Sequence, residues 1–180
     1  MKTKYILILS GLLLLFSACK RDDDEPKSAP VPLEFVYDGN KHILAGGSLL
    51  HYPSISTPQA QSLGLLLYTD GVDLQFDPQG FPSGAAGNGF ILYFDCLSSD
   101  STVLSSGWYE MDTLNLPKTI TWGSVNPVVN GNMDLWFDCK SASFEVLYEN
   151  GQYTITGEGL DEADFGFTFS YQGPLDWYQE

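Results

Sequence analysis

Short alternating segments separated by turn residues most constrain how this chain can fold. After residue 33, apolar and polar residues alternate in short runs, and clusters of Gly, Asn, Asp and Pro separate the runs. A period of two places successive side chains on opposite faces of a β-strand, whereas an amphipathic helix needs a period of 3.6. Only residues 56–63 have a pattern that suits even a short helical turn, so we expect an all-β domain.

The alternating runs predict the positions of individual strands. Asp70-Gly71 and Asn150-Gly151 each stand between two such runs, which is a strong hairpin signal. Residues 77–88 hold several glycines and two prolines, and we expect a loop there. The segments expected as strands are 34–38, 41–45, 62–69, 72–76, 89–97, 107–111, 118–122, 133–139, 141–148, 152–157 and 165–171.

Many short strands at near-even spacing favour an architecture that protects strand edges. A single antiparallel β-sandwich is the first expectation, and a closed, lipocalin-like β-barrel is the alternative. Residues 34–180 are the usual length of one domain, and a chain of this size needs neither a disulfide nor a metal to fold.

The first 18 residues have the pattern of a secretory signal peptide. Lys2 and Lys4 precede an apolar stretch from Tyr5 to Phe16, and small residues follow it. A membrane-spanning helix needs about 20 apolar residues, so this stretch is too short to remain as an anchor. We therefore expect residues 1–18 to be removed on export.

Cys19 stands directly after this stretch. Phe16-Ser17-Ala18-Cys19 resembles the lipobox of bacterial lipoproteins, and the resemblance implies cleavage before Cys19 and lipidation of its thiol and amino group. Two or more acyl chains anchor a protein stably, whereas one holds it only marginally. An ordinary cysteine behind a conventional cleavage site is the alternative.

Residues 19–33 read as a lipidated acidic tether. The run Lys20-Arg21-Asp22-Asp23-Asp24-Glu25 is typical of a solvated linker. It also resembles the acidic export signal that follows the lipid cysteine in surface lipoproteins of the Bacteroidetes type, although Arg21 moves the acidic run one place further out. The resemblance implies an outer-membrane lipoprotein exposed at the cell surface, with a periplasm-facing position as the alternative.

The charge of the domain excludes several classes of function. The formal net charge of the chain is −15, and Lys41, Lys118 and Lys140 are the only basic side chains after residue 33. An acidic surface repels nucleic acid and anionic headgroups. Without arginine, no bidentate clamp on phosphate can form. We therefore expect no nucleic-acid binding, no phosphoryl chemistry and no cofactor.

Two further cysteines lie in similar segments, Leu92-Tyr93-Phe94-Asp95-Cys96 and Leu135-Trp136-Phe137-Asp138-Cys139. Alternation places Phe90, Leu92, Phe94 and Cys96 on one face of a strand, and Met133, Leu135, Phe137 and Cys139 on one face of another. Both thiols should point into the core. An exported protein permits a disulfide between Cys96 and Cys139, and two buried free thiols are the other expectation.

The order of several segments resembles small Bacteroidetes-type lipoproteins with one β domain and no assigned activity. The segments that carry the resemblance are Asn88–Phe94, Leu104–Tyr109, Gly151–Ile155 and Phe169–Leu175. The resemblance spans roughly residues 34–175. It implies an all-β lipoprotein and supplies no catalytic residue.

Residues that repeat between the two cysteine segments are the first candidates for a ligand site. Trp136 and Tyr93 alternate away from the cysteine face, beside Asp138 and Asp95. An exposed aromatic ring with neighbouring carboxylates can stack on a sugar ring while the acids accept its hydroxyls. The same residues could instead cover a loop, and the two aspartates could simply face solvent.

Other candidate chemistry is weaker. His42 and His51 belong to no nucleophile or zinc motif and suit turn positions. Asp161, Glu162 and Asp164 with Glu158 could offer oxygens to calcium, but their spacing matches no EF-hand loop and suits a solvated turn.

These patterns lead to three hypotheses. The first is a non-enzymatic surface protein that binds a glycan or protein partner and is held to the membrane through Cys19. The second is a structural or accessory lipoprotein of an outer-membrane assembly. The third, a minor one, is a glycoside hydrolase that uses paired carboxylates.

Overall fold

The computed structural model describes residues 31–77, 82–133 and 135–179. These residues form β-strands, one 3-10 turn at Pro53–Ile55 and no α-helix, so the all-β prediction is confirmed. The signal peptide, Cys19 and nearly all of the tether lie outside the described residues. Among the residues described, no helix has the length and apolarity needed to cross a membrane.

The described residues form twelve strands, and several run further than their alternating pattern predicted. They are β1 Glu34–Tyr37, β2 Asn40–His51, β3 Gln61–Thr69, β4 Val72–Phe76, β5 Pro82–Gly87, β6 Gly89–Ser98, β7 Gly107–Met111, β8 Thr119–Val128, β9 Phe137–Glu149, β10 Gln152–Asp161, β11 Gly166–Gly173 and β12 Asp176–Gln179.

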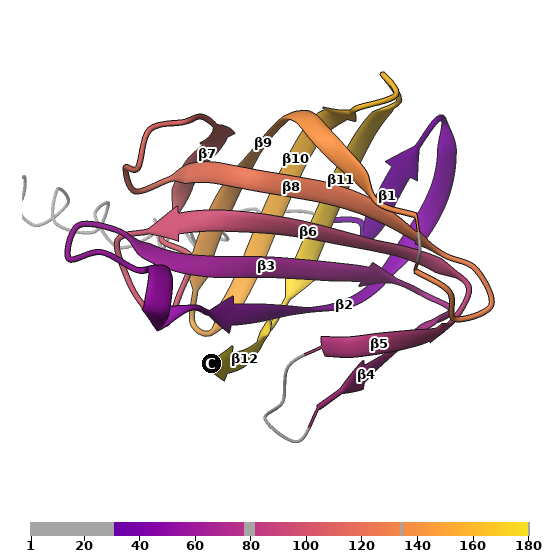
Figure 1. The fold of residues 1–180 in the computed structure, drawn as a ribbon, viewed down its shortest axis with the longest axis horizontal. Coiled ribbons are helices and arrows are strands. Elements are labelled where there is room, and N and C mark those ends of the chain that lie inside the picture. The colour runs from indigo at the N-terminus through magenta and orange to yellow at the C-terminus, as the bar shows by residue number, and fades with distance from the viewer. Residues whose placement is uncertain (1–30, 78–81, 134, 180) are drawn as a thin grey trace, which may run out of the picture.

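A single sheet closes on itself as a nine-stranded barrel (Figure 1). Its order is β1-β11-β10-β9-β7-β8-β6-β3-β2, and the pairing of β1 with β2 closes the ring. The short β12 extends the sheet beside β2, in parallel register with Ser48–His51. The first expectation, a sandwich, was therefore wrong, whereas the closed barrel is consistent with the lipocalin-like alternative. Closure depends on the pairing of β1 with β11, which no local pattern encodes.

Aromatic side chains fill the interior of the barrel. Phe94 packs against Phe144 and Phe169, with ring centroids 5.4 and 5.5 Å apart. Leucines from β2, β3 and β6 complete this cluster, and its members are almost fully buried. The interior is a packed core, as in small barrels whose side chains meet at the axis.

Glycines make room for these rings. A Cβ at Gly157 would lie 2.5 Å from Cβ of Phe144 and 2.7 Å from Cζ of Phe169. A Cβ at Gly123 would lie 2.7 Å from Cδ1 of Phe94. Glycine in a strand commonly marks such a close approach, and here it lets a narrow barrel hold large aromatic residues.

A hairpin lies outside the barrel wall. Strands β4 and β5 form a separate two-stranded sheet (Figure 1), so the loop predicted over residues 77–88 is wrong for Pro82–Gly87. Val72 and Ala85 face the wall and pack on Leu66, Ile91 and Val128. This second apolar cluster fixes the hairpin against the outer surface of β3, β6 and β8.

The segment predicted as a strand over 133–139 is a strand only from Phe137. Leu135 is exposed, so the predicted common face of Met133, Leu135, Phe137 and Cys139 is wrong. Cys139 does pack against the core, but the next inward residue of β9 is Ala142. The register between β9 and β10 shifts at this point, and such a bulge moves the following side chains to the opposite face.

Candidate functional site

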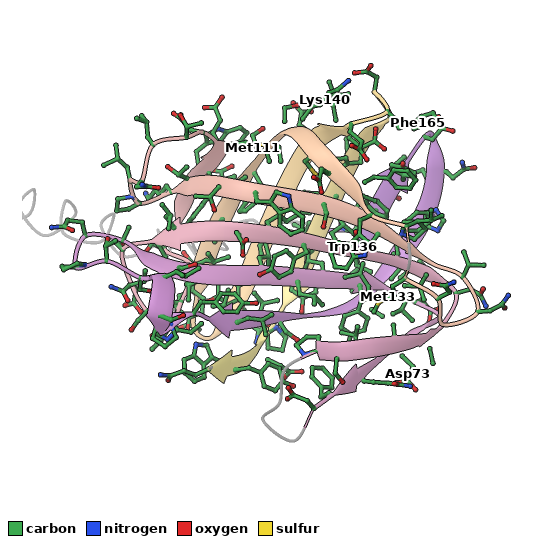
Figure 2. The ribbon with its side chains drawn as sticks, viewed as in Figure 1. Asp73, Met111, Met133, Trp136, Lys140 and Phe165 are labelled. Atoms are coloured by element: carbon green, nitrogen blue, oxygen red, sulfur yellow. The ribbon has the colours of Figure 1, made fainter. Side chains whose placement is uncertain are left out.

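A groove with a volume of about 180 Å³ lies on the outer wall of the barrel, beneath the β4–β5 hairpin. Its floor comes from β2, β3, β6 and β8, one side from the hairpin, and the other from the segment that leads into β9. Figure 2 labels Met133 and Trp136, which lie on the face of the wall that carries the hairpin. The lining residues are Leu50, Tyr52, Leu66, Leu74, Pro82, Gly84, Ile91, Tyr93, Asn126, Met133 and Trp136.

Tyr93 lies along the edge of the floor because the facing strand has no side chain there. Its Cα partner across the ladder is Leu66, and a Cβ at Gly64 would lie 2.6 Å from its hydroxyl oxygen. The Tyr93 hydroxyl donates to Oδ1 of Asp95 at 2.6 Å and lies 3.0 Å from the hydroxyl of Tyr52. These bonds hold the ring in one orientation at the edge of the groove.

Two tryptophans continue the aromatic edge. The rings of Tyr93 and Trp122 have centroids 5.7 Å apart, and those of Trp122 and Trp136 are stacked at 6.3 Å. Trp136 remains about half exposed, at 52%. The row Tyr93–Trp122–Trp136 therefore presents aromatic surface to solvent beside an apolar groove, an arrangement suited to a ligand ring or side chain.

Asn126 places a polar group in the groove. It is 2% exposed, and its Nδ2 donates to the hydroxyl of Ser124 at 3.0 Å. Its Oδ1 is buried and accepts no hydrogen bond. An unsatisfied buried acceptor costs about 1–3 kcal/mol, so it is rare in native proteins and calls for an explanation. Because Oδ1 has almost no accessible surface, it lies beneath the surface of the groove.

The two predicted carboxylates occupy different positions. Asp95 is partly buried beside Tyr93, and burial raises the pKa of its carboxyl, while the hydrogen bond from Tyr93 acts in the opposite direction. Asp138 is exposed at the start of β9, opposite Ser124, and does not line the groove. Of the four predicted residues, Trp136 and Tyr93 line the groove, Asp95 supports it, and Asp138 lies outside it.

The charge beside the groove is negative. No basic residue is among its lining residues, whereas Asp95 adjoins it. An anionic ligand would be desolvated without a counter-charge, which is unfavourable. The groove therefore suits a neutral or cationic group.

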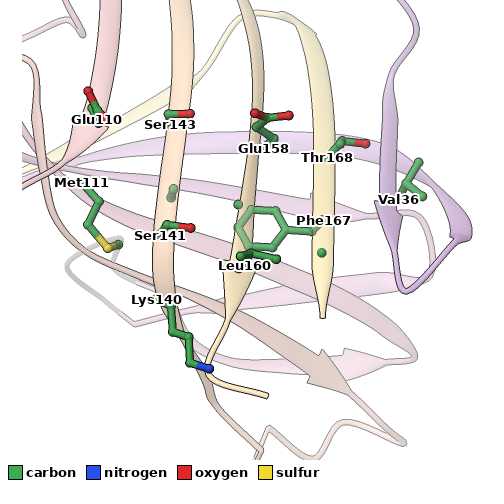
Figure 3. Close-up of a pocket in the computed structure, with 13 residues that line it drawn as sticks. Val36, Glu110, Met111, Lys140, Ser141, Ser143, Glu158, Leu160, Phe167 and Thr168 are labelled. Carbon is green, nitrogen blue, oxygen red and sulfur yellow. The ribbon is translucent and has the colours of Figure 1, made fainter. Parts of the chain in front are cut away.

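A second hollow of about 510 Å³ lies on the outer wall across β7, β9, β10 and β11 (Figure 3). Glu110, Ser143, Glu158 and Thr168 form a row across four strands, as the strand registers also show. Both glutamates are exposed, and the hollow has no wall that excludes water. Its acids lack the enclosed setting that tunes a carboxyl for acid catalysis.

Cys96 and Cys139 are free thiols in the described structure, which has no disulfide between them. Burial raises the pKa of Cys139 to about 12 and that of Cys96 well above its usual range. Thiolates are the reactive form of cysteine, so both groups act as small apolar core residues.

The two histidines and the acidic turn after β10 make their contacts within the protein. His42 contacts the ring of Phe90, with centroids 4.7 Å apart. His51 is buried at the end of β2, so its predicted turn position is wrong. Asp161 is also buried and accepts hydrogen bonds from Tyr37, Ala163 and Phe165, which close the turn after β10. In the described part of the chain, no three His, Cys, Asp or Glu side chains gather as metal ligands do.

Sequence reasoning missed Asn126, Tyr52 and Trp122. Asn126 and Ser124 alternate with Val125 and Pro127, which predicts a solvent-facing side of β8. The segment after Val128 folds back over this side and buries it, with Met133 and Trp136 against the wall. The only available signal was a pair of polar residues in a strand next to Trp122.

Comparisons of the chain with protein-family models, with curated proteins and with solved structures find no match. The groove, the barrel and the amino-terminal sequence are therefore the observations on which a function can rest.

Proposed function

We propose that this protein is a lipid-anchored binding protein, held at the outer membrane through Cys19, whose groove takes a group from a glycan or protein partner. Its role is recognition, not catalysis. The single observation that carries the proposal is the half-exposed ring of Trp136, which together with Tyr93 borders a groove lined mainly by apolar side chains.

The composition of the groove supports binding. Aliphatic and aromatic side chains make up most of its lining, and one amide and two phenols are its polar groups. Binding sites commonly have this composition, in which apolar area supplies affinity and a few polar atoms fix orientation. A catalytic site would need a nucleophile or a base in reach of the ligand, and the lining supplies no histidine, cysteine, lysine or carboxylate.

The amino-terminal sequence supports the anchor. A signal-like segment ends at Ser17-Ala18-Cys19, and a charged run follows. On this proposal Cys19 carries the lipid, residues 20–33 act as the tether, and the barrel faces the cell exterior. The groove would then be available to soluble partners beside the membrane.

A ligand screen tests the binding role. Residues 28–180 are the appropriate protein, because every residue of the interior core lies between Phe35 and Tyr171. Thermal shift is measured with a panel of neutral oligosaccharides, with calcium and with uncharged peptides. We expect a stabilising ligand whose effect is lost in Trp136→Ala.

Trp108→Ala is the matched control. Trp108 is exposed to a similar extent, 54%, but lies on β7 and outside the lining of the groove. A ligand that loses its effect equally in both variants binds elsewhere, and this result would contradict the assignment of the site.

The anchor needs a separate test. Cys19→Ser should remove the added mass of the lipid from the protein. It should also move the protein from the membrane fraction to the soluble fraction. Protease treatment of intact cells then distinguishes display at the surface from a periplasm-facing position. Wild-type protein that lacks the lipid mass would refute the anchor and leave the groove untouched.

A further inference from the structure

The groove has few polar side-chain groups. Its lining supplies two phenol hydroxyls, those of Tyr52 and Tyr93, and one side-chain amide, that of Asn126. The amide lies beneath the surface, and the Tyr93 hydroxyl already donates to Asp95. A group that enters the groove therefore leaves water and gains few hydrogen bonds in return. Such a group must carry few donors and acceptors of its own, because each one left unpaired is costly.

The accessible rim of the groove is aromatic and apolar. Trp136 is exposed, and Tyr52, Tyr93 and Met133 are only partly buried, so a ligand can reach their side chains. The floor between them consists of buried aliphatic side chains from β2, β3 and β6. Methyl and methylene groups of a ligand would leave water on this surface, which is favourable.

Negative charge lies beside this aromatic rim. The hydroxyl of Tyr93 lies 2.6 Å from Oδ1 of Asp95, and no residue that lines the groove is basic. The faces of aromatic rings also attract cations, through the negative side of the ring quadrupole. The groove is therefore complementary in charge to a cation.

The scarcity of acceptors decides which kind of cation fits. An unmethylated ammonium group has three N–H donors and is strongly hydrated. The groove cannot replace that hydration with its few polar groups. A quaternary ammonium has no N–H donor and presents methyl groups, so it can lie against aromatic rings without an unpaired donor. The lining therefore favours a fully methylated ammonium group.

The volume of the groove suits such a group on an aliphatic stem. It is about 180 Å³, which is below the roughly 300–1,000 Å³ of pockets for drug-sized ligands. It is slightly more than an apolar cavity of about 150 Å³ that accommodates a benzene ring. The groove therefore holds one compact head and the methylene groups next to it, and the rest of the ligand lies outside.

The charge of Asp95 also distinguishes between carriers of this group. A choline ester of phosphate has an anionic group close to its ammonium, and the groove has no basic side chain to offset that anion. The side chain of a trimethylated lysine has no neighbouring anion. Its aliphatic stem can lie along the apolar floor, as the stems of lysine side chains do on other apolar surfaces.

We propose that the groove binds the trimethylated lysine side chain of a partner protein, with the methylated head against the rings of Tyr93 and Trp136 and its charge near the carboxylate of Asp95. This inference rests on the proposed binding function and names the group that the site recognises.

The test compares two peptides that differ only in one charge. Both are short, acetylated and amidated at their ends, and uncharged elsewhere. One carries trimethyllysine, and the other carries the same side chain with carbon in place of the ammonium nitrogen, so that it ends in a tert-butyl group. Calorimetric titration of residues 28–180 measures both affinities. We expect the cationic peptide to bind about fivefold more tightly or better, within the range of cation–π contacts.

Asp95→Asn tests the contribution of the carboxylate. The amide still accepts the hydrogen bond from Tyr93, so the ring keeps its position while the charge is removed. We expect the cationic peptide to bind about threefold more weakly or worse, and the tert-butyl peptide to be little affected. Asp138→Asn is the matched control, because it removes an equal charge at an exposed position outside the groove.

The outcomes separate this inference from the proposed function. Equal binding of the two peptides, or equal losses in Asp95→Asn and Asp138→Asn, would overturn the cation site. An unmethylated lysine peptide that binds as tightly would overturn the preference for methyl groups. Tighter binding of choline or phosphocholine would identify a small molecule or a lipid headgroup as the ligand and overturn the protein partner. If no peptide binds, but an oligosaccharide stabilises the protein and Trp136→Ala abolishes that effect, the binding function stands and this inference is wrong.

Discussion

The hydroxyl of Tyr93 donates a 2.6 Å hydrogen bond to Oδ1 of Asp95, two residues further along β6. Both side chains project from the outer face of the wall, and the bond fixes the ring that edges the groove. The carboxylate accepts this bond in a partly buried position, where ionisation is less favourable than in water. The orientation of the Tyr93 ring beside the groove is therefore linked to the charge on Asp95.

Asp95→Asn should stabilise the protein at neutral pH and have little effect in acid. Burial raises the folded-state pKa of Asp95 above the unfolded value of about 3.9. An acid of this kind favours the fold below its unfolded pKa, and this stability is lost as the pH rises through the folded-state pKa. The amide still accepts from Tyr93 but never ionises, so the gain over wild type should grow from pH 3.5 to pH 7.

Urea unfolding at these two pH values measures the effect. Asp138→Asn is the control. Asp138 is exposed, and its substitution also removes one negative charge from the outer wall. A gain at pH 7 that is equal in both variants would indicate a general charge effect and contradict the role of burial.

The double substitution of Ser124→Ala and Asn126→Leu should raise the free energy of unfolding by about 1–3 kcal/mol. The gain is expected because the pair removes a buried acceptor without a partner, and also the bond between the two side chains, so that no polar atom is left unpaired. Urea unfolding of the double variant and the wild type measures the effect. A double variant less stable than the wild type would contradict the assignment of Oδ1 of Asn126 as an unpaired acceptor.

Local patterning predicted most strands and most of their inward faces. Leu92, Phe94 and Cys96 are fully buried as their alternation predicts, and β4 and β7 have the expected bounds. The sequence offered the closed barrel only as the alternative to a sandwich, because closure depends on β1 pairing with β11, which lies far from it in the chain. The prediction of a loop over residues 77–88 was wrong for β5. Small residues form a strand there because Ala85 packs against the barrel wall.

The candidate site was half predictable. Tyr93 and Trp136 alternate away from the core, so sequence could select them as outward aromatics. Asn126 also points outward, but its burial depends on the segment of Met133 and Trp136 that folds back over β8. Period-two patterns identify the face of a strand, whereas they carry no information on what covers that face.

Cys96 and Cys139 should resist alkylation in the folded protein and react after unfolding. Burial raises the pKa of Cys139 to about 12, so its thiolate fraction at pH 8 is small, and Cys96 is fully buried. Mass spectrometry after iodoacetamide treatment, with and without urea and without reductant, should show two added groups only in urea. No addition in urea would mean that the two cysteines are bridged.

Gly157→Ala should destabilise the barrel by about 1–3 kcal/mol, as overpacking of a filled core does. The new methyl group would lie 2.5 Å from Cβ of Phe144 and 2.7 Å from the carbonyl oxygen of Ser143. The second of these is backbone and cannot rotate away, so β9 and β10 must separate. Gly166→Ala is the matched control, because its nearest neighbour would be Cδ2 of Leu160 at 3.8 Å. That variant should be neutral or gain about 0.4–1 kcal/mol from the reduced freedom of its unfolded chain. Urea unfolding of both variants checks the prediction, and equal effects would mean that the interior has space beside Phe144 and is not packed as described.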